Sequence, residues 1–225
     1  MNSQTKPKPA AVLAEPIKII TPEAWQWEVL ATAFYGDQVM KFWLGNEASK
    51  DQYLAFFEAV VKDTLDSGGA VFASPDKQVV LVWTALRYTL EEPGPWKRKW
   101  YEVLGPEGLK RYNSLYEAGD LGIKPEHLKN SMLPDYMGVM PETQGLGYGS
   151  HILKWTFDYY QKQNYEIPFL IASTRRSAKL YGPLINLYIH KEVFLTDVEE
   201  DGVAVFMKHN SLRNESLLQN IDSLN

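Results

Sequence analysis

A glycine-rich stretch between an apolar run and a helical pattern constrains this chain more than any other feature. It reads VMPETQGLGYGS over residues 139–150, follows the apolar run 133–139 and leads into the helical pattern 151–163. A strand, a glycine-rich turn and a helix in this order aim free backbone N–H groups and the positive end of the helix dipole at an anion. Glycines also remove side chains that would keep a phosphate away from the backbone. We therefore interpret the stretch as a pyrophosphate-binding loop.

Two other phosphate-binding loops do not fit these residues. A P-loop needs a Lys followed by Ser or Thr after its last glycine, and residues 148–151, Tyr-Gly-Ser-His, supply no lysine. A dinucleotide-binding fingerprint needs G-x-G-x-x-G early in a βαβ unit, whereas here the glycines follow G-x-G-x-G beyond the middle of the chain. A glycine-rich connection that binds nothing is the alternative that the glycines alone leave open.

The stretch contains V-x-P followed by Q-x-x-G-x-G, formed by Val139, Pro141, Gln144, Gly147 and Gly149. This pattern resembles the acetyl-CoA-binding motif of the GNAT N-acetyltransferase superfamily. The resemblance implies acetyl-CoA as co-substrate, with its pyrophosphate on the N–H groups of the loop and its pantetheine arm along the preceding strand. The binding residues implied in this way are Met137, Gly138, Val139, Gln144, Gly145, Leu146, Gly147, Tyr148, Gly149 and Ser150.

Composition excludes several classes of function. The chain has 225 residues, 45% of them apolar, which suits one domain with a full core. A net charge of −5 without a basic block argues against nucleic acid as partner and weakly favours a cationic acceptor. The absence of cysteine rules out disulfides and thiolate chemistry, and the four histidines share no ligand spacing, so we expect no metal site. No signal-peptide core or membrane-spanning run is present, so we expect a cytoplasmic protein without a membrane partner.

Periodicity predicts alternating strands and helices. We expect a flexible leader over 1–15, a single domain over 16–209 with a helical insertion at about 87–132, and a mobile tail over 210–225. Strands are predicted at 16–20, 70–73, 78–86, 133–139, 167–173, 192–198 and 203–208, and helices at 22–35, 50–66, 151–163 and 175–186. The pair Gly182-Pro183 is expected to kink or end the last helix.

This order of elements resembles the GNAT fold, an α/β fold with a twisted mixed sheet, splayed central strands and helices on both faces. The insertion falls between the third and fourth strands. Together with the segments 31–34 and 80–84, it resembles the puromycin N-acetyltransferase branch of the superfamily.

The resemblance also implies a catalytic tyrosine on the helix after the fifth strand. Tyr181 occupies that position, and a phenol with a pKa of about 10 stays protonated at neutral pH, so it can act as general acid. A packing tyrosine is the alternative. Ser177 stands where the family has an asparagine and is predicted to hydrogen-bond pantetheine. Asp135, at even spacing before Val139, is predicted to share its strand face and is a candidate base; a solvated strand-end residue is the alternative.

We therefore expect an enzyme that moves an acetyl or short acyl group from acyl-CoA to a primary amine on a small molecule. The alternatives are a protein Lys or N-terminal acetyltransferase and a CoA-binding sensor without turnover. The insertion, with Trp96 and Trp100, and the two predicted N-terminal helices are expected to form the acceptor wall. Arg175 and Arg176 are candidates for contacts to CoA phosphates. The oligomeric state stays open, with a homodimer as one option.

Overall fold

The computed structural model describes residues 13–87, 99–196, 198 and 202–213. Most of the predicted leader, Trp96 and the tail from residue 214 therefore lie outside the described residues. The described end of the leader lies on the domain, because the side chain of His151 contacts the carbonyl oxygen of Ala14 at 3.0 Å.

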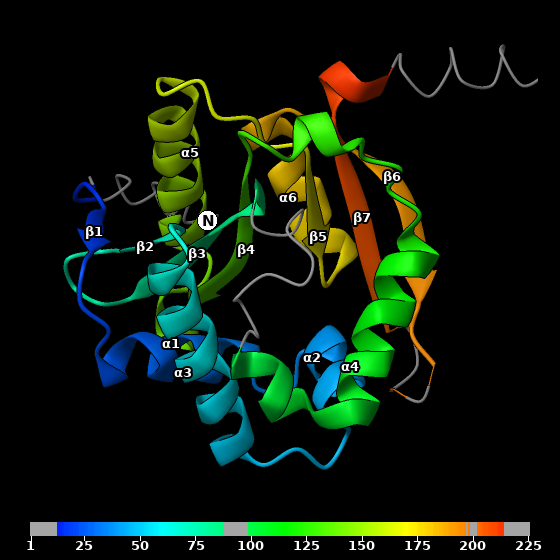
Figure 1. Cartoon of the computed structure of the whole chain (residues 1–225). Coiled ribbons are helices and arrows are strands. Elements are labelled where there is room, and N and C mark those ends of the chain that lie inside the picture. Colours follow the sequence, from blue (N-terminus) through cyan, green and yellow to red (C-terminus); the bar gives the residue numbers. More distant parts are fainter. Residues whose placement is uncertain (1–12, 88–98, 197, 199–201, 214–225) are drawn as a thin grey trace, which may run out of the picture.

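The strands form two antiparallel sheets that lie next to each other (Figure 1). The first has the order β1 (Ile17–Ile19), β2 (Ala70–Ala73), β3 (Val79–Ala85), β4 (Met132–Val139). The second has the order β5 (Phe169–Ala172), β7 (Val203–His209), β6 (Leu187–Phe194).

The two sheets meet where β4 and β5 begin. Residues Ser131 and Glu166 form a parallel bridge there. The N–H of Met132 donates to the carbonyl of Glu166, and the N–H of Glu166 donates to the carbonyl of Asn130, both at 2.9 Å. Past this point, within the described residues, no ladder joins β4 to β5. The central strands therefore splay apart, as predicted.

Helices cover both faces of the two sheets. On one face, α1 (Ala24–Phe34) and α3 (Lys50–Asp66) pack on the first sheet, while α2 (Gln38–Leu44) and α4 (Lys99–Gly119) extend this layer to the second. On the other face, α5 (Tyr148–Gln161) packs on the first sheet and α6 (Arg175–Ile185) on the second. Strand β3 is buried on both sides: Val80 and Val82 pack with α1 to α4, and Val79 and Leu81 pack with α5 and α6. This alternation follows from the two-residue period of a strand. Short 3₁₀ turns span Pro125–His127, Pro141–Thr143 and Asn210–Leu212.

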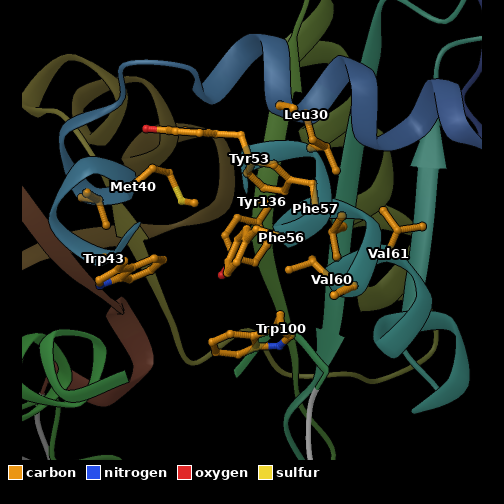
Figure 2. Close-up of a cluster of buried hydrophobic side chains, with 14 of the residues drawn as sticks. Leu30, Met40, Trp43, Tyr53, Phe56, Phe57, Val60, Val61, Trp100 and Tyr136 are labelled. Atoms are coloured by element: carbon orange, nitrogen blue, oxygen red, sulfur yellow. The ribbon is translucent and has the colours of Figure 1, made fainter. Parts of the chain in front are cut away.

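Aromatic rings fill the core between α3, α4 and β4 (Figure 2). The rings of Phe56 and Phe57 meet the ring of Tyr136 edge-on at 5.9 and 5.5 Å. Trp100 closes this cluster from α4, with its ring 5.8 Å from that of Phe56. The chain bends within α4, where Gly105 has φ 65° and Pro106 follows.

Four features differ from the sequence-based expectation. Helix α2 was not predicted. Helix α6 spans Arg175–Ile185, close to the predicted 175–186, but the expected end at Gly182-Pro183 is wrong: the helix continues through Pro183, and its last turn packs closely on β6, where a Cβ at Gly182 would lie 3.1 Å from the carbonyl oxygen of Leu187. Strand β6 begins at Leu187, five residues earlier than predicted, because that residue pairs with His209 of β7.

The predicted mobile tail begins too early as well. Residues Asn210–Leu212 form a 3₁₀ turn in which Leu212 is buried. The side chain of Asn210 donates to the carbonyl oxygen of Asn186 at 3.0 Å, which holds the turn on the end of α6. In the part of the chain that the structure describes, no helix has the length and apolar character needed to cross a membrane.

Candidate active site

A cavity of about 800 Å³ occupies the gap between β4 and β5, a size typical of small-molecule sites. Its wall comes from α1, α2, β4, the glycine-rich loop, the start of α5, β5 and α6, with Tyr116 from α4. Most of the predicted site residues line it: Asp135, Met137, Val139, Gln144, Gly145, Gly147, Tyr148, Gly149, Ser150, Ser177 and Tyr181. Gly138 and Leu146 do not.

Each glycine of the loop has a distinct geometric role. Gly145 and Gly147 have φ of 79° and 92°, a left-handed conformation that side chains disfavour. A Cβ at either position would meet no atom within 4 Å, so the loop leaves open space beside its backbone. A Cβ at Gly149 would lie 3.3 Å from Met137 and Val139, so this glycine lets α5 pack closely on β4.

Five N–H groups of the loop are available to an anion. The first helical bond of α5 runs from the N–H of His151 to the carbonyl of Gly147 at 2.9 Å, so the N–H groups of residues 148–150 precede it. The N–H groups of Gln144 and Leu146 donate to Pro141 and Thr143 at 3.3 and 3.2 Å. The predicted run of donors from 144 to 150 therefore reduces to Gly145, Gly147, Tyr148, Gly149 and Ser150.

The other predicted loop and strand residues support the backbone. The side-chain amide of Gln144 donates to the carbonyl oxygen of Val139 at 3.2 Å and ties the loop to β4. The hydroxyl of Tyr148 donates to Asp76 at 2.5 Å and ties the start of α5 to the β2–β3 turn. Gly138 lets α1 approach β4, since a Cβ there would lie 3.0 Å from the Cα of Leu30. Leu146 is 65% exposed.

Asp135 is the extra residue of a β-bulge. In the register of β3 with β4, Val82 faces Tyr136 and Trp83 faces Pro134, which leaves Asp135 between them. Its carboxylate accepts a hydrogen bond from the hydroxyl of Thr84 at 2.8 Å. By alternation with Val82, Thr84 points toward α1 to α4.

The bulge therefore turns Asp135 away from the face of Met137 and Val139, which pack against α5. The predicted shared face of Asp135 and Val139 is wrong, because even spacing does not hold across a bulge. The cavity consequently has two sides. The α5 side contains Met137, Val139 and the loop; the α2 side contains Asp135 and the residues around α2.

Tyr181 lies on α6 at the boundary between the two sides. Burial raises the pKa of its phenol, a hydrogen bond with Ser177 lowers that pKa, and the negative charge of Asp37 raises it. The net shift is upward, so Tyr181 is protonated at neutral pH. Ser177 lies one helical turn before Tyr181, and its hydroxyl also accepts from Thr174 at 2.8 Å. Ser177 thus contacts the phenol itself.

Solved acetyltransferase structures share the fold of this chain. One described as histone acetyltransferase HPA2 and related acetyltransferase, from Corynebacterium glutamicum, aligns over 87% of this chain and 97% of its own, with 15% identity and a TM-score of 0.54. A mosquito arylalkylamine N-acetyltransferase-like protein aligns over 86% and 98%, with 15% identity and a TM-score of 0.53.

An agmatine N-acetyltransferase variant aligns over 87% and 98%, with 10% identity and a TM-score of 0.51. The chain has the GNAT fold. At these identities the likeness concerns the fold alone. No protein-family model matches this chain, and no curated protein sequence matches it either. The narrower resemblance to the puromycin N-acetyltransferase branch stays a prediction.

Within this GNAT fold, the cavity is lined by a second carboxylate, Asp37, which the sequence analysis did not identify. Asp37 caps α2, and its Oδ1 accepts from the N–H groups of Val39 and Met40 at 3.0 and 3.1 Å. Burial raises the pKa of Asp37, and hydrogen bonds from Ser173 and the two capping N–H groups only partly offset this. An Asp before a short amphipathic segment signals an N-cap, but its burial depends on distant elements.

Aromatic side chains form the wall on the α2 side. They are Phe34, Trp43, Tyr116 and Tyr136. Burial, Tyr112 and Asp135 together raise the pKa of Tyr116, so Asp135 lies near this wall. The described insertion contributes Tyr116, whereas Trp100 is buried in the core and does not line the cavity. The second predicted N-terminal helix, now α3, contributes no lining side chain; the unpredicted α2 does so instead.

The cationic side chains near the cavity differ in whether they can contact a bound ligand. Arg175 forms a bidentate ion pair with Glu192, with its Nε at 3.0 Å and its Nη2 at 2.8 Å from the same Oε2. Arg176 and Lys179 line the cavity instead. Among the described residues, no three histidine or carboxylate side chains gather as metal ligands would.

Proposed function

We propose that this protein transfers an acetyl or another short acyl group from acyl-CoA to the primary amine of a small molecule. The observation that carries this proposal is the continuity of one cavity through the splayed strands. Five free N–H groups lie on its α5 side, and an aromatic chamber with carboxylates lies on its α2 side. Two substrates that enter from opposite sides can react directly, because each is aligned by its own wall.

On the α5 side, the loop suits a pyrophosphate. Its N–H groups start a helix whose dipole favours an anion, and the open space beside Gly145 and Gly147 admits a phosphate to the backbone. Acetyl-CoA is the co-substrate that this loop would hold, and it supplies the thioester. Arg176 and Lys179 line the same cavity and would attract its phosphates.

Acyl transfer from a thioester requires a proton for the departing sulfur. Tyr181 meets this need, because its raised pKa keeps the phenol protonated. The transfer also requires that the acceptor ammonium lose a proton before attack. Asp135 is the candidate base from sequence, and it lines the α2 side beside Tyr116.

A small-molecule acceptor agrees with the aromatic wall, since aromatic side chains bury an apolar body while polar groups fix its orientation. The names of two proteins with this fold, an arylalkylamine and an agmatine N-acetyltransferase, refer to small amines and support the same class. Acetylation of a protein Lys or N-terminus, and CoA binding without turnover, are the competing functions.

Thiol release tests the proposal. Purified protein is incubated with acetyl-CoA and, separately, arylalkylamines, diamines, aminoglycosides and lysine peptides. We expect amine-dependent thiol release with at least one small amine, together with its N-acetyl product by mass spectrometry. Release with peptides alone would favour a protein acetyltransferase, and CoA binding without any release would favour a sensor.

A further inference from the structure

The cavity contains two carboxylates with different neighbours. Asp37 acts on Tyr181, because its negative charge contributes to the raised pKa of that phenol. The charge of Asp135 acts on Tyr116, at the aromatic wall, and its carboxylate is held by Thr84. Asp37 is therefore the carboxylate that lies near the group poised to protonate the sulfur.

The position of Asp37 also relates it to the splayed strands. Ser173, which directly follows β5 and lines the same cavity, lies close enough to Asp37 to lower the pKa of its carboxyl group. Both capping bonds, to the N–H groups of Val39 and Met40, use Oδ1. The cap therefore does not involve Oδ2, so this oxygen can take a proton while the cap stays in place.

Capping alone does not explain a carboxylate here. Asn and Ser cap helices about as well as Asp and carry no charge. Burial opposes the charge of Asp37, so its ionised form costs the folded protein free energy that an Asn would not cost. A charged residue that lines a cleft and lowers the stability of the folded protein is a candidate for a catalytic role.

We propose that Asp37, rather than Asp135, accepts the first proton from the acceptor's ammonium group. The nitrogen lone pair then forms the N–C bond while the C–S bond breaks. The sulfur takes the proton of Tyr181, and the second nitrogen proton restores the phenol. The sum converts R–NH₃⁺ and acetyl-CoA into the amide, the CoA thiol and one proton, which leaves as Asp37 returns to its carboxylate. Asp135 attracts the ammonium to the aromatic wall. The inference rests on the proposed function.

The pH dependence follows from the groups around Asp37. Tyr53 of α3 and Tyr181 of α6 are the ionisable groups whose pKa values rise partly through its charge, and burial raises both further. Both phenols are neutral across the acidic range. Arg176, Lys179 and Asp135 line the same cavity. Because burial raises the pKa of Asp37, kcat/KM should fall on the acidic side at a higher pH than an unperturbed aspartate would give.

Two acceptors of equal size separate a base from a binding residue. 2-Phenylethylamine is an ammonium ion at neutral pH, whereas O-benzylhydroxylamine has the same number of heavy atoms and is uncharged there. Only the first needs a base before attack. The Asp37→Asn variant keeps an oxygen for the cap, and Asp135→Asn is the matched comparison.

We expect Asp37→Asn to lower kcat/KM for 2-phenylethylamine by roughly 10²- to 10⁴-fold and to remove the acidic limb of its pH profile. For O-benzylhydroxylamine the loss should stay below about tenfold, which is less than the smallest typical general-base contribution. The variant should bind CoA normally and melt no lower than wild type, since a costly charge is gone. Asp135→Asn should raise KM for the ammonium substrate and keep the limb.

An unchanged acidic limb in Asp37→Asn, or its loss in Asp135→Asn instead, would overturn the assignment of Asp37 and leave the proposed function intact. Equal losses with both acceptors would make Asp37 a positioning residue and likewise overturn it. Absence of turnover of any amine by the wild-type protein would defeat the proposed function itself, and the role of Asp37 would fall with it.

Discussion

Single residues in this site act through backbone geometry and protonation state. Tyr181 is kept protonated mainly by burial, and the negative charge of Asp37 raises the pKa of its phenol further. Gly145 and Gly147 act through positive φ angles, which leave N–H groups exposed to the cavity. Two single substitutions therefore test the proposed reaction. Removal of the Tyr181 hydroxyl tests the proton donor, and introduction of a side chain at Gly147 tests the CoA-binding loop.

Tyr181→Phe removes the hydroxyl and little volume. If the phenol protonates the sulfur, kcat should fall by roughly 10²–10⁴ while the affinity for CoA stays nearly unchanged. Steady-state kinetics and calorimetric titration with CoA measure the two quantities. Tyr188→Phe, on β6 and away from the cavity, is the control. A normal kcat in Tyr181→Phe would reduce this residue to a packing role.

The raised pKa of Tyr181 also leads to a prediction about activity at alkaline pH. The pKa of its phenol in the folded protein lies above the usual value of about 10. The phenol is therefore fully protonated at lower pH, and it loses its proton only as the pH rises through that raised pKa. We expect no Tyr181-dependent fall in kcat between about pH 7 and 9, measured at saturating substrates. A fall in this window that disappears in Tyr181→Phe would contradict the raised pKa.

Gly147→Val tests the loop. A branched side chain would fill the open space beside the backbone, so binding of CoA should be lost in calorimetric titration. Gly45→Val is a matched control, because Gly45 has φ 97° and equally open surroundings at the end of α2. Both variants should lose about 1–2 kcal/mol of stability through strain. Wild-type affinity in Gly147→Val, or equal loss in both variants, would contradict the loop assignment.

At the scale of elements, α1, α2, Tyr136 of β4 and Tyr116 of α4 form the acceptor wall, whereas most of α4 supports the core. Tyr116→Leu should therefore raise the KM of the acceptor and leave the KM of acetyl-CoA unchanged. Trp100→Ala should instead lower the free energy of unfolding by about 3–5 kcal/mol, with both KM values nearly normal in the folded fraction. Kinetics and chemical denaturation measure these effects. An altered acceptor KM in Trp100→Ala without destabilisation would reverse the two roles.

Elements encoded by local sequence could be predicted, and those that depend on distant pairing could not. The strand, loop and helix around residues 139–150 follow from glycine spacing and periodicity, and so does α3. Helix α2 has only seven residues and gives little periodicity. The bulge at Asp135 depends on its register with β3. The burial of Asp37 depends on tertiary packing, since Ser173 and Tyr181 belong to segments far along the chain.

At the scale of the whole molecule, CoA would bridge two sheets whose backbones, within the described residues, pair with each other only at the start of β4 and β5. Ligand at 100 times its Kd should stabilise the protein by about 2.7 kcal/mol. In hydrogen exchange we expect added protection in residues 144–150, β4 and β5, and little change in β1, which lies at the far edge of the first sheet. Protection confined to β6 and β7 would place CoA elsewhere.

A crystal structure of the protein with CoA tests the central claim most directly. The account predicts the pyrophosphate on the N–H groups of Gly145, Gly147, Tyr148, Gly149 and Ser150, the pantetheine arm between β4 and β5, and the sulfur within hydrogen-bond distance of the Tyr181 hydroxyl. The chamber beside Phe34 and Tyr116 should remain free for the amine. CoA bound outside the gap, or with its thiol remote from Tyr181, would contradict the account.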